Sequence, residues 1–410
     1  MTSLAYAALW IFVFAVPWER LIVLPGLSII TRATGILALG LTLFAIVISG
    51  RVRRWRVFHV AALLFVLWTG VGVWILHEGT IPQKLYTFAQ LFLVLWMIWE
   101  LAPSAGRQRG LLTAYLLGAC VSALGTLLLY RREAGALQRF AAGGADPNSL
   151  AMTLALALPI AWYLGLTYRR PLLRWLCRGY VPLGLLAAAL TGSRGGMLAC
   201  MVALLVIPLT MTLSPGRLTS AIAFLGLSGA LAVAYVPDRI VQRLASTGAE
   251  VQDASFGGRF KLWKAGMHVF AEKPVIGSGV ATFKHAITPE LGGAAQVAHN
   301  SFISVLVEEG LVGFLLYMAM LLSVFFSILH LPRLERRFGL ILLATLGTAM
   351  LPLTWEDQKD VWFIMAALIG MATLQVSGTS GAVRQPLPRR AVPIGGTPAA
   401  ARSMERDATA

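Results

Sequence analysis

Charged side chains are scarce in this sequence. Only 13% of the 410 residues are Asp, Glu, Lys or Arg, whereas 58% are hydrophobic. Because soluble domains carry about 25% charged residues, this scarcity excludes an ordinary soluble globular protein. A mean hydropathy of +0.75 indicates a polytopic membrane protein instead.

Acidic residues are scarcer than basic ones, 18 against 34, which gives a formal net charge of +16. In a soluble chain this excess would suggest a nucleic-acid partner. Most of the arginines, however, fall in short loops between apolar runs. That placement is a membrane-topology signal, and we expect no nucleic acid to bind.

Cysteine is also rare, and Cys120, Cys177 and Cys200 show neither paired spacing nor neighbouring histidines. The pattern predicts no metal site, and the cysteines are interpreted as small residues in or near helices. No cofactor is expected. The first apolar run, 4–17, lacks a basic start and a small-residue cleavage site, so it is predicted to be a retained helix.

Long apolar runs dominate what remains. A bilayer core of about 30 Å needs about 20 apolar residues per helix. The sequence accordingly predicts an all-α fold with about twelve transmembrane helices, at 4–20, 33–50, 58–76, 83–102, 110–130, 147–167, 180–193, 195–213, 218–236, 299–328, 339–354 and 361–377.

Arginines define the expected orientation, because they follow every even-numbered span up to the tenth: Arg51, Arg53, Arg54, Arg56, Arg107, Arg109, Arg169, Arg170, Arg174, Arg178, Arg217, Arg333, Arg336 and Arg337. Basic loops are retained in the cytoplasm, so both termini are predicted to be cytoplasmic. The alternate loops carry nearly all the acids outside the membrane, which agrees with the same topology.

The predicted domain organisation is one transmembrane catalytic domain, 1–377, and a disordered cytoplasmic tail, 378–410, rich in Pro, Gly, Ala and Arg. Within the domain, 236–298 forms one large polar loop on the non-cytoplasmic side. From Arg259 onward this loop shows aromatic and apolar residues at helical spacing. We expect an amphipathic helix at the membrane interface, ended by Pro274.

Two arginines at this membrane face are candidates for binding an anion. Arg194 lies between glycines in Gly192-Ser193-Arg194-Gly195-Gly196, and Arg259 follows Gly257-Gly258 at a helix entrance. Free backbone N–H groups and the helix dipole favour an anion there. Since a guanidinium binds phosphate oxygens in bidentate fashion, the pair would make a pyrophosphate clamp without a metal. Contact with lipid headgroups is the alternative for each arginine.

His299 stands at the start of a long apolar run. A continuous helix from His299 would place Gly310 and Gly313 near the histidine face and Glu308 nearly opposite, which predicts close packing below the histidine. Glu308 and Glu309 would lie within the membrane, where acids need protein partners or a water-filled cavity. A capping or interfacial role is the alternative for His299.

Five further residues are candidates for substrate binding: Lys84, Arg139, Lys261, Trp263 and Asn300. The polar stretches around Asp146-Pro147-Asn148 and from Trp355 to Asp360 could also line a polar cleft. Solvated loop residues, or lipid contacts in the case of Lys261, are the alternative interpretation.

Several of these motifs together resemble the superfamily of O-antigen ligases and O-antigen polymerases. The matching features are Ser193-Arg194-Gly195-Gly196, Gly258-Arg259 with Trp263, Phe270, Pro274, Gly277 and Gly279, Ala298-His299-Asn300 followed by Glu309-Gly310 and Gly313, and Asp146-Pro147-Asn148. The resemblance covers mainly residues 140–355. It implies an integral-membrane C-type glycosyltransferase of the bacterial inner membrane, with a periplasmic active site.

The resemblance also implies substrates and roles. The donor would be an undecaprenyl-pyrophosphate-linked glycan, and the acceptor a lipid A-core sugar in ligases or another lipid-linked repeat unit in polymerases. Arg194 and Arg259 fall on the family's pyrophosphate-binding arginines, and His299 on its essential histidine. We expect metal-independent, inverting transfer with His299 as the base. The alternative hypotheses are, in order, a polymerase, a ligase that joins glycan to protein, and a transporter of lipid-linked sugar.

Overall fold

The structure is a computed structural model that describes residues 2–21, 30–76, 82–133, 137–210, 215–245 and 258–382. The described residues are helical or irregular, with no strand among them. The long helices are α1 (Thr2–Ala15), α2 (Ile30–Ser49), α3 (Val57–Leu76), α4 (Gln83–Leu101), α5 (Ala105–Glu133), α6 (Pro147–Thr167), α7 (Pro171–Leu190), α8 (Arg194–Leu204), α10 (Pro215–Tyr235), α13 (Arg259–Glu272), α16 (Ser301–Leu329), α17 (Arg333–Met350) and α18 (Lys359–Ala382).

The shorter elements are η1 (Val16–Trp18), η2 (Ala142–Gly144), α9 (Val206–Thr210), α11 (Asp238–Ala245), α14 (Phe283–Ala286), α15 (Thr288–Leu291) and η4 (Gly292–Ala294). In the described residues each of the twelve predicted spans overlaps a helix; the eighth covers two, α8 and α9, and its residues 211–213 lie outside the described part. Among the described helices, six are long and apolar enough to cross a bilayer, namely α2, α3, α4, α5, α6 and α16. The all-α membrane fold is confirmed at that level, whereas the count of twelve spans stays a prediction.

Helix α6 forms the centre of the bundle. Its sequence is almost entirely Ala, Leu and other uncharged residues, and 89% of its most apolar 18-residue stretch is buried. Small alanines let α5, α7, α8 and α17 pack closely around it. Asp146 caps its first turn by accepting the backbone N–H of Ser149 at 2.8 Å, and Pro147 occupies the first helical position. The core helix thus presents a fixed N-terminal turn.

The outside of the bundle is apolar, as expected for a lipid-facing surface. Val47 of α2 is 80% exposed and Trp74 of α3 is 85% exposed. Exposing such a surface to water over whole helices would be unfavourable, whereas contact with lipid tails is favourable. All three cysteines are free thiols, and none is exposed, as the sequence predicts.

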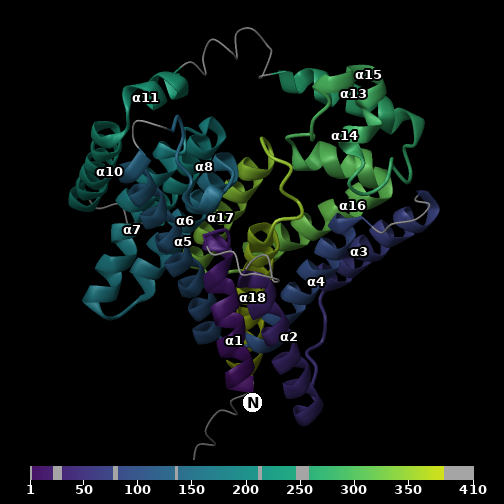
Figure 1. Ribbon diagram of the computed structural model, residues 1–410. Coiled ribbons are helices and arrows are strands. Elements are labelled where there is room, and N and C mark those ends of the chain that lie inside the picture. The colour runs from purple at the N-terminus through teal and green to yellow at the C-terminus, as the bar shows by residue number, and fades with distance from the viewer. Residues whose placement is uncertain are drawn as a thin grey trace, which may run out of the picture.

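Two groups of helices lie at the end of the bundle opposite the N-terminus (Figure 1). Helices α13, α14 and α15 lie on one side above α16, and α10 and α11 lie on the other. The basic stretch at the start of α5 lies near the N-terminal end, where the Tyr6 hydroxyl donates to the Arg107 carbonyl at 2.7 Å. This stretch is therefore at the end opposite the polar segment, in agreement with the predicted topology; which end faces the periplasm stays a prediction.

The predicted polar loop 236–298 contains α11, α13, α14, α15 and η4, while its residues 246–257 lie outside the described part. The amphipathic helix begins at Arg259, as expected. Its Leu262, Ala265 and Gly266 are buried, and Phe260 and Met267 are exposed. Helix α18 continues to Ala382, into the start of the predicted tail, and the rest of that tail is outside the described residues.

Candidate active site

A cavity of about 810 Å³ lies between α13 of one group, α11 of the other, and the core helices α6 and α8. We call it the arginine cavity. It is lined by side chains from α6, the α7–α8 turn, α8, α11, α13 and two loops: Asn148, Met152, Gly192, Ser193, Arg194, Gly195, Met197, Leu198, Met201, Arg243, Leu244, Arg259, Leu262, Gln296, His299, Pro352 and Leu353. Arg194, Arg259 and His299 therefore meet at one space.

Arg194 is held by the turn that starts α8. The Ser193 hydroxyl caps the helix by accepting the backbone N–H of Gly196 at 3.2 Å. Gly192 has a φ of 60°, a left-handed conformation that favours glycine at the end of α7. A side-chain carbon on Gly195 would lie 2.9 Å from Pro352 Cγ. The glycines thus let the turn pack tightly, with Arg194 at the cavity.

Arg259 is the first residue of α13. It follows Gly258, whose φ of 82° turns the chain sharply into the helix. The helix is anchored through Gly266, where an added carbon would lie 2.8 Å from the Phe283 ring. The N-terminal turn therefore brings both a guanidinium and the positive end of a helix dipole to the cavity.

His299 does not lie in a helix. Its φ of 47° is left-handed, and its backbone N–H donates to the Thr354 hydroxyl at 3.0 Å. On one side, the Trp263 indole N–H donates to the Ala298 carbonyl at 2.8 Å. On the other, the Asn300 side chain caps α16 by accepting the N–H groups of Phe302 and Ile303. An unusual backbone conformation at a cavity is held here by three surrounding contacts.

The environment of His299 favours the neutral imidazole. Burial lowers the pKa of His299 from its ordinary value near 6.5, and the nearby Arg259 guanidinium lowers it further. Asp146 acts in the opposite direction. A half-buried histidine with this balance can accept a proton at neutral pH.

The loop that holds Thr354 is itself locked to α16. The Ser301 hydroxyl donates to the Leu353 carbonyl at 2.9 Å and accepts the Trp355 N–H at 2.8 Å. Ser304 donates to Glu356, and Glu356 also binds Lys84 at 2.6 Å. This network fixes the loop from Leu353 to Trp355 against α16, and the loop in turn holds the backbone of His299 through Thr354.

Lys84 belongs to that network and does not line the arginine cavity. Its ammonium is 2.7 Å from Glu308 and 2.6 Å from Glu356. Glu308 also accepts the N–H groups of Ala281 and Phe283. Lys84 and Glu308 therefore form an ion pair. A protein partner is one of the environments expected for Glu308, whereas Lys84 was expected either to bind substrate or to be a solvated loop residue.

The other candidates occupy supporting or outlying positions. Arg139 donates to the Thr191 carbonyl and the Asn148 side chain, both at 2.7 Å, and so braces the turn before Arg194. Trp263 and Asn300 hold the two sides of His299, as described. Lys261 is exposed on α13 and is not part of the cavity lining.

Arg243 of α11 was not among the predicted site residues, yet it lines the cavity. Its Nε donates to the Gly192 carbonyl at 3.2 Å, and its own carbonyl accepts the Arg194 Nε at 3.0 Å. Three arginines thus line the cavity, and no acid appears among its described lining residues. Such a space attracts an anion strongly.

The helical count from His299 was wrong from its start, because His299 precedes the helix and has a left-handed backbone conformation. Helix α16 begins at Ser301 and is broken at Gly310, where φ is 66° and ψ is −170°. The segment 274–279 inserts at the break: Leu311 N–H donates to the Pro274 carbonyl, and Gly279 N–H to the Glu308 carbonyl, both at 2.8 Å. Gly310 is therefore needed for backbone approach at a break. Gly313 does pack closely, against Glu309 and Trp68.

No group of three His, Cys, Asp or Glu residues that could hold a metal occurs in the described ranges. Metal independence stays a prediction, because this observation concerns only those ranges.

A comparison with known proteins finds that part of the chain that forms the site matches a known family. Residues 179–318 match the family model described as O-antigen ligase. The matched segment includes Arg194, Arg243, Arg259 and His299. A search of curated proteins found no match. The resemblance to the O-antigen ligase and polymerase superfamily is thereby confirmed.

Proposed function

We propose, on the premise that residues 179–318 match the O-antigen ligase family, that this protein transfers a glycan from undecaprenyl-pyrophosphate to an acceptor hydroxyl. The observation that carries the proposal is that Arg194, Arg259 and His299 line one cavity of about 810 Å³. These three residues come from distant parts of the chain, and the space that they line is large enough for a pyrophosphate and the sugar attached to it.

In the proposed reaction, His299 takes the proton from the acceptor hydroxyl as its oxygen attacks the anomeric carbon. The bond between that carbon and the pyrophosphate oxygen breaks in the same step. Arg194 and Arg259 stabilise the negative charge that develops on the departing pyrophosphate. A single displacement inverts the anomeric carbon, and the proton on His299 is then released to water.

The apolar wall of the cavity suits the lipid part of the donor. Met197, Leu198 and Met201 line it from α8, and Leu198 and Met201 are 50% and 58% exposed. An exposed apolar strip beside a cationic cavity can hold a polyprenyl chain on the membrane side while the pyrophosphate meets the arginines. The proposed location is the bacterial inner membrane, with the site facing the periplasm.

The acceptor we propose is lipid A-core, which makes the protein an O-antigen ligase. A polymerase with a lipid-linked acceptor is the alternative. A carrier of lipid-linked sugar is disfavoured, because the cations gather at one end, whereas alternating access needs a site near the middle of the bilayer.

Purified protein, lipid-linked O-antigen and lipid A-core in detergent test the proposal directly. We expect lipid A-core carrying the glycan, formed without any vesicle gradient, and its loss with His299→Ala. Extension of the lipid-linked glycan instead would indicate a polymerase. If correctly folded protein formed neither product, the result would contradict a transferase.

A further inference from the structure

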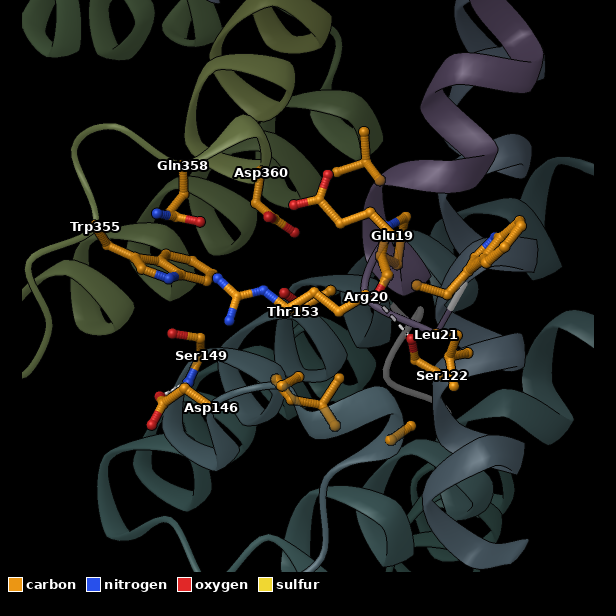
Figure 2. Close-up of a pocket in the computed structure, with 16 residues that line it drawn as sticks. Glu19, Arg20, Leu21, Ser122, Asp146, Ser149, Thr153, Trp355, Gln358 and Asp360 are labelled. Atoms are coloured by element: carbon orange, nitrogen blue, oxygen red, sulfur yellow. Dashed lines mark hydrogen bonds between the residues drawn. The ribbon is translucent and has the colours of Figure 1, made fainter. Parts of the chain in front are cut away.

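A second, smaller space lies on the other side of the first turn of α6. This cleft, with a volume of about 50 Å³, is lined by polar side chains from three parts of the chain: Glu19, Arg20, Asp146, Ser149, Gln358 and Asp360. We call it the polar cleft. In Figure 2 the Arg20 side chain reaches across it toward Trp355, with Gln358 and Ser149 on opposite sides.

Hydrogen-bond donors in the polar cleft lack protein partners. The indole N–H groups of Trp18 and Trp355 are buried and make no hydrogen bond within the described chain. Trp355 is only 2% exposed. Because a buried donor without a partner costs about 1–3 kcal/mol, the two indoles point to a ligand or water that accepts from them. Arg20 also lines the cleft and makes no ion pair or hydrogen bond with a described residue, but its side chain is exposed and can be hydrated.

Hydrogen-bond acceptors are present in the same space. Asp360 accepts the Tyr115 hydroxyl at 2.5 Å through one oxygen, and Asp146 accepts the Ser149 N–H through one oxygen. Glu19 binds Lys359 and Thr31 through the same oxygen. Asp146 and Glu19 therefore each have a second oxygen that is not used in these bonds, whereas Asp360 is also hydrogen-bonded by Thr153. A ligand with hydroxyl groups, which both donate and accept, fits such a set.

The charge of the polar cleft argues against an anionic ligand. Three carboxylates surround one arginine, with Lys359 pairing Glu19 at 2.9 Å. An anion would meet at least as much negative as positive charge there, in contrast to the arginine cavity. A neutral hydroxylated ligand avoids this repulsion.

The polar cleft and the arginine cavity share a wall. Asp146 and Ser149 line the cleft, and Asn148 between them lines the cavity. In the loop after α17, Leu353 lines the cavity and Trp355 lines the cleft. The volume exceeds the roughly 10–15 Å³ that one water needs, so several hydroxyl groups fit but a whole glycan does not.

We propose that the polar cleft binds hydroxyl groups of a neutral sugar in the acceptor glycan, next to the cavity that holds the donor pyrophosphate. This inference rests on the proposed function, because it assigns the second substrate of that reaction to a place. Arg20 would donate to the sugar hydroxyls, and Gln358 and Ser149 would donate to or accept from them.

Direct binding tests the assignment without turnover. The probes are dephosphorylated core oligosaccharide, the repeat-unit oligosaccharide and inorganic pyrophosphate, each measured by saturation-transfer NMR on the full chain in detergent. We expect Arg20→Ala and Ser149→Ala to weaken binding of one oligosaccharide at least tenfold and to leave pyrophosphate binding unchanged. Arg259→Ala should show the reverse pattern. Arg132→Ala, an exposed arginine at the end of α5, serves as the control.

Three results would overturn the inference: no oligosaccharide binding by the wild type, binding insensitive to Arg20→Ala and Ser149→Ala, or equal loss of pyrophosphate binding in those variants. The proposed function fails differently, by absence of transfer while the oligosaccharide still binds in an Arg20-dependent way. Among supporting results, the oligosaccharide that binds distinguishes a ligase, which takes the core, from a polymerase, which takes the repeat unit.

Discussion

The arginine cavity and the polar cleft lie on two sides of the same helical turn, yet their chemistry differs. Three arginines and a histidine line the first, without an acid among its described lining residues, whereas carboxylates, one arginine, an amide and hydroxyls line the second. The contrast teaches that charge, as well as size, distinguishes the two spaces. An anionic leaving group fits one and a neutral hydroxylated acceptor fits the other.

Removal of the histidine should have the largest effect. His299→Ala should lower kcat about 10²–10⁴-fold, because the acceptor hydroxyl loses its base, while the donor KM changes little. Single-turnover transfer with saturating donor measures this. His268→Ala, an exposed histidine that pairs with Glu290 at 3.1 Å, is the control. Full activity of His299→Ala would remove the histidine from the mechanism.

Replacement of the cavity arginines by lysine should come next. Arg194→Lys and Arg259→Lys keep the charge but lose the planar fork, so kcat/KM should fall about 10–100-fold. Lys261→Ala, on the exposed side of α13, should retain normal kinetics. Unchanged kcat/KM in both arginine variants would argue against bidentate recognition of phosphate.

The pH dependence of kcat should link the two spaces. His299 must be neutral to act as a base, and its pKa lies below 6.5, so the rate should be full above that pKa and fall as the pH drops through it. Asp146 raises this pKa, so Asp146→Asn should move the acid limb to lower pH, while asparagine still caps α6. Glu133→Gln is the control. A limb that moves upward in Asp146→Asn would contradict the assignment.

Packing of the Arg194 turn should give the smallest effect. Gly195→Ala places a carbon 2.9 Å from Pro352 Cγ, so we expect about 1–3 kcal/mol of destabilisation and a modest rise in donor KM. Gly226→Ala is the matched control, since nothing lies within 4 Å of its added carbon. Thermal unfolding in detergent measures both. Equal stability of the two variants would show that the turn can relax.

Sequence alone predicted the helices well, because runs of apolar residues long enough for a bilayer leave few alternatives. It also indicated Arg194 and Arg259, since glycine-flanked arginines at a membrane face suggest phosphate binding. For His299 the residues alone left a capping or interfacial role open, and the family resemblance gave it the role of base. It missed Arg243 and Arg20, which carry no local motif and reach their sites only through tertiary packing. The helical count from His299 failed because His299 lies outside α16, which begins at Ser301, and because the helix is broken at Gly310.

The break in α16 has a consequence for motion. Backbone hydrogen bonds at 2.8–2.9 Å join Ser278 and Gly279 to the carbonyls of Val307 and Glu308. Swinging the α13 side outward as a lid would strip these amides of their partners, and each amide left buried without a partner would raise the free energy of the open form. The amide hydrogens of Ser278 and Gly279 should therefore exchange slowly. Under the proposed function, access for the lipid-linked substrates would then come from rearrangement elsewhere around the cavity.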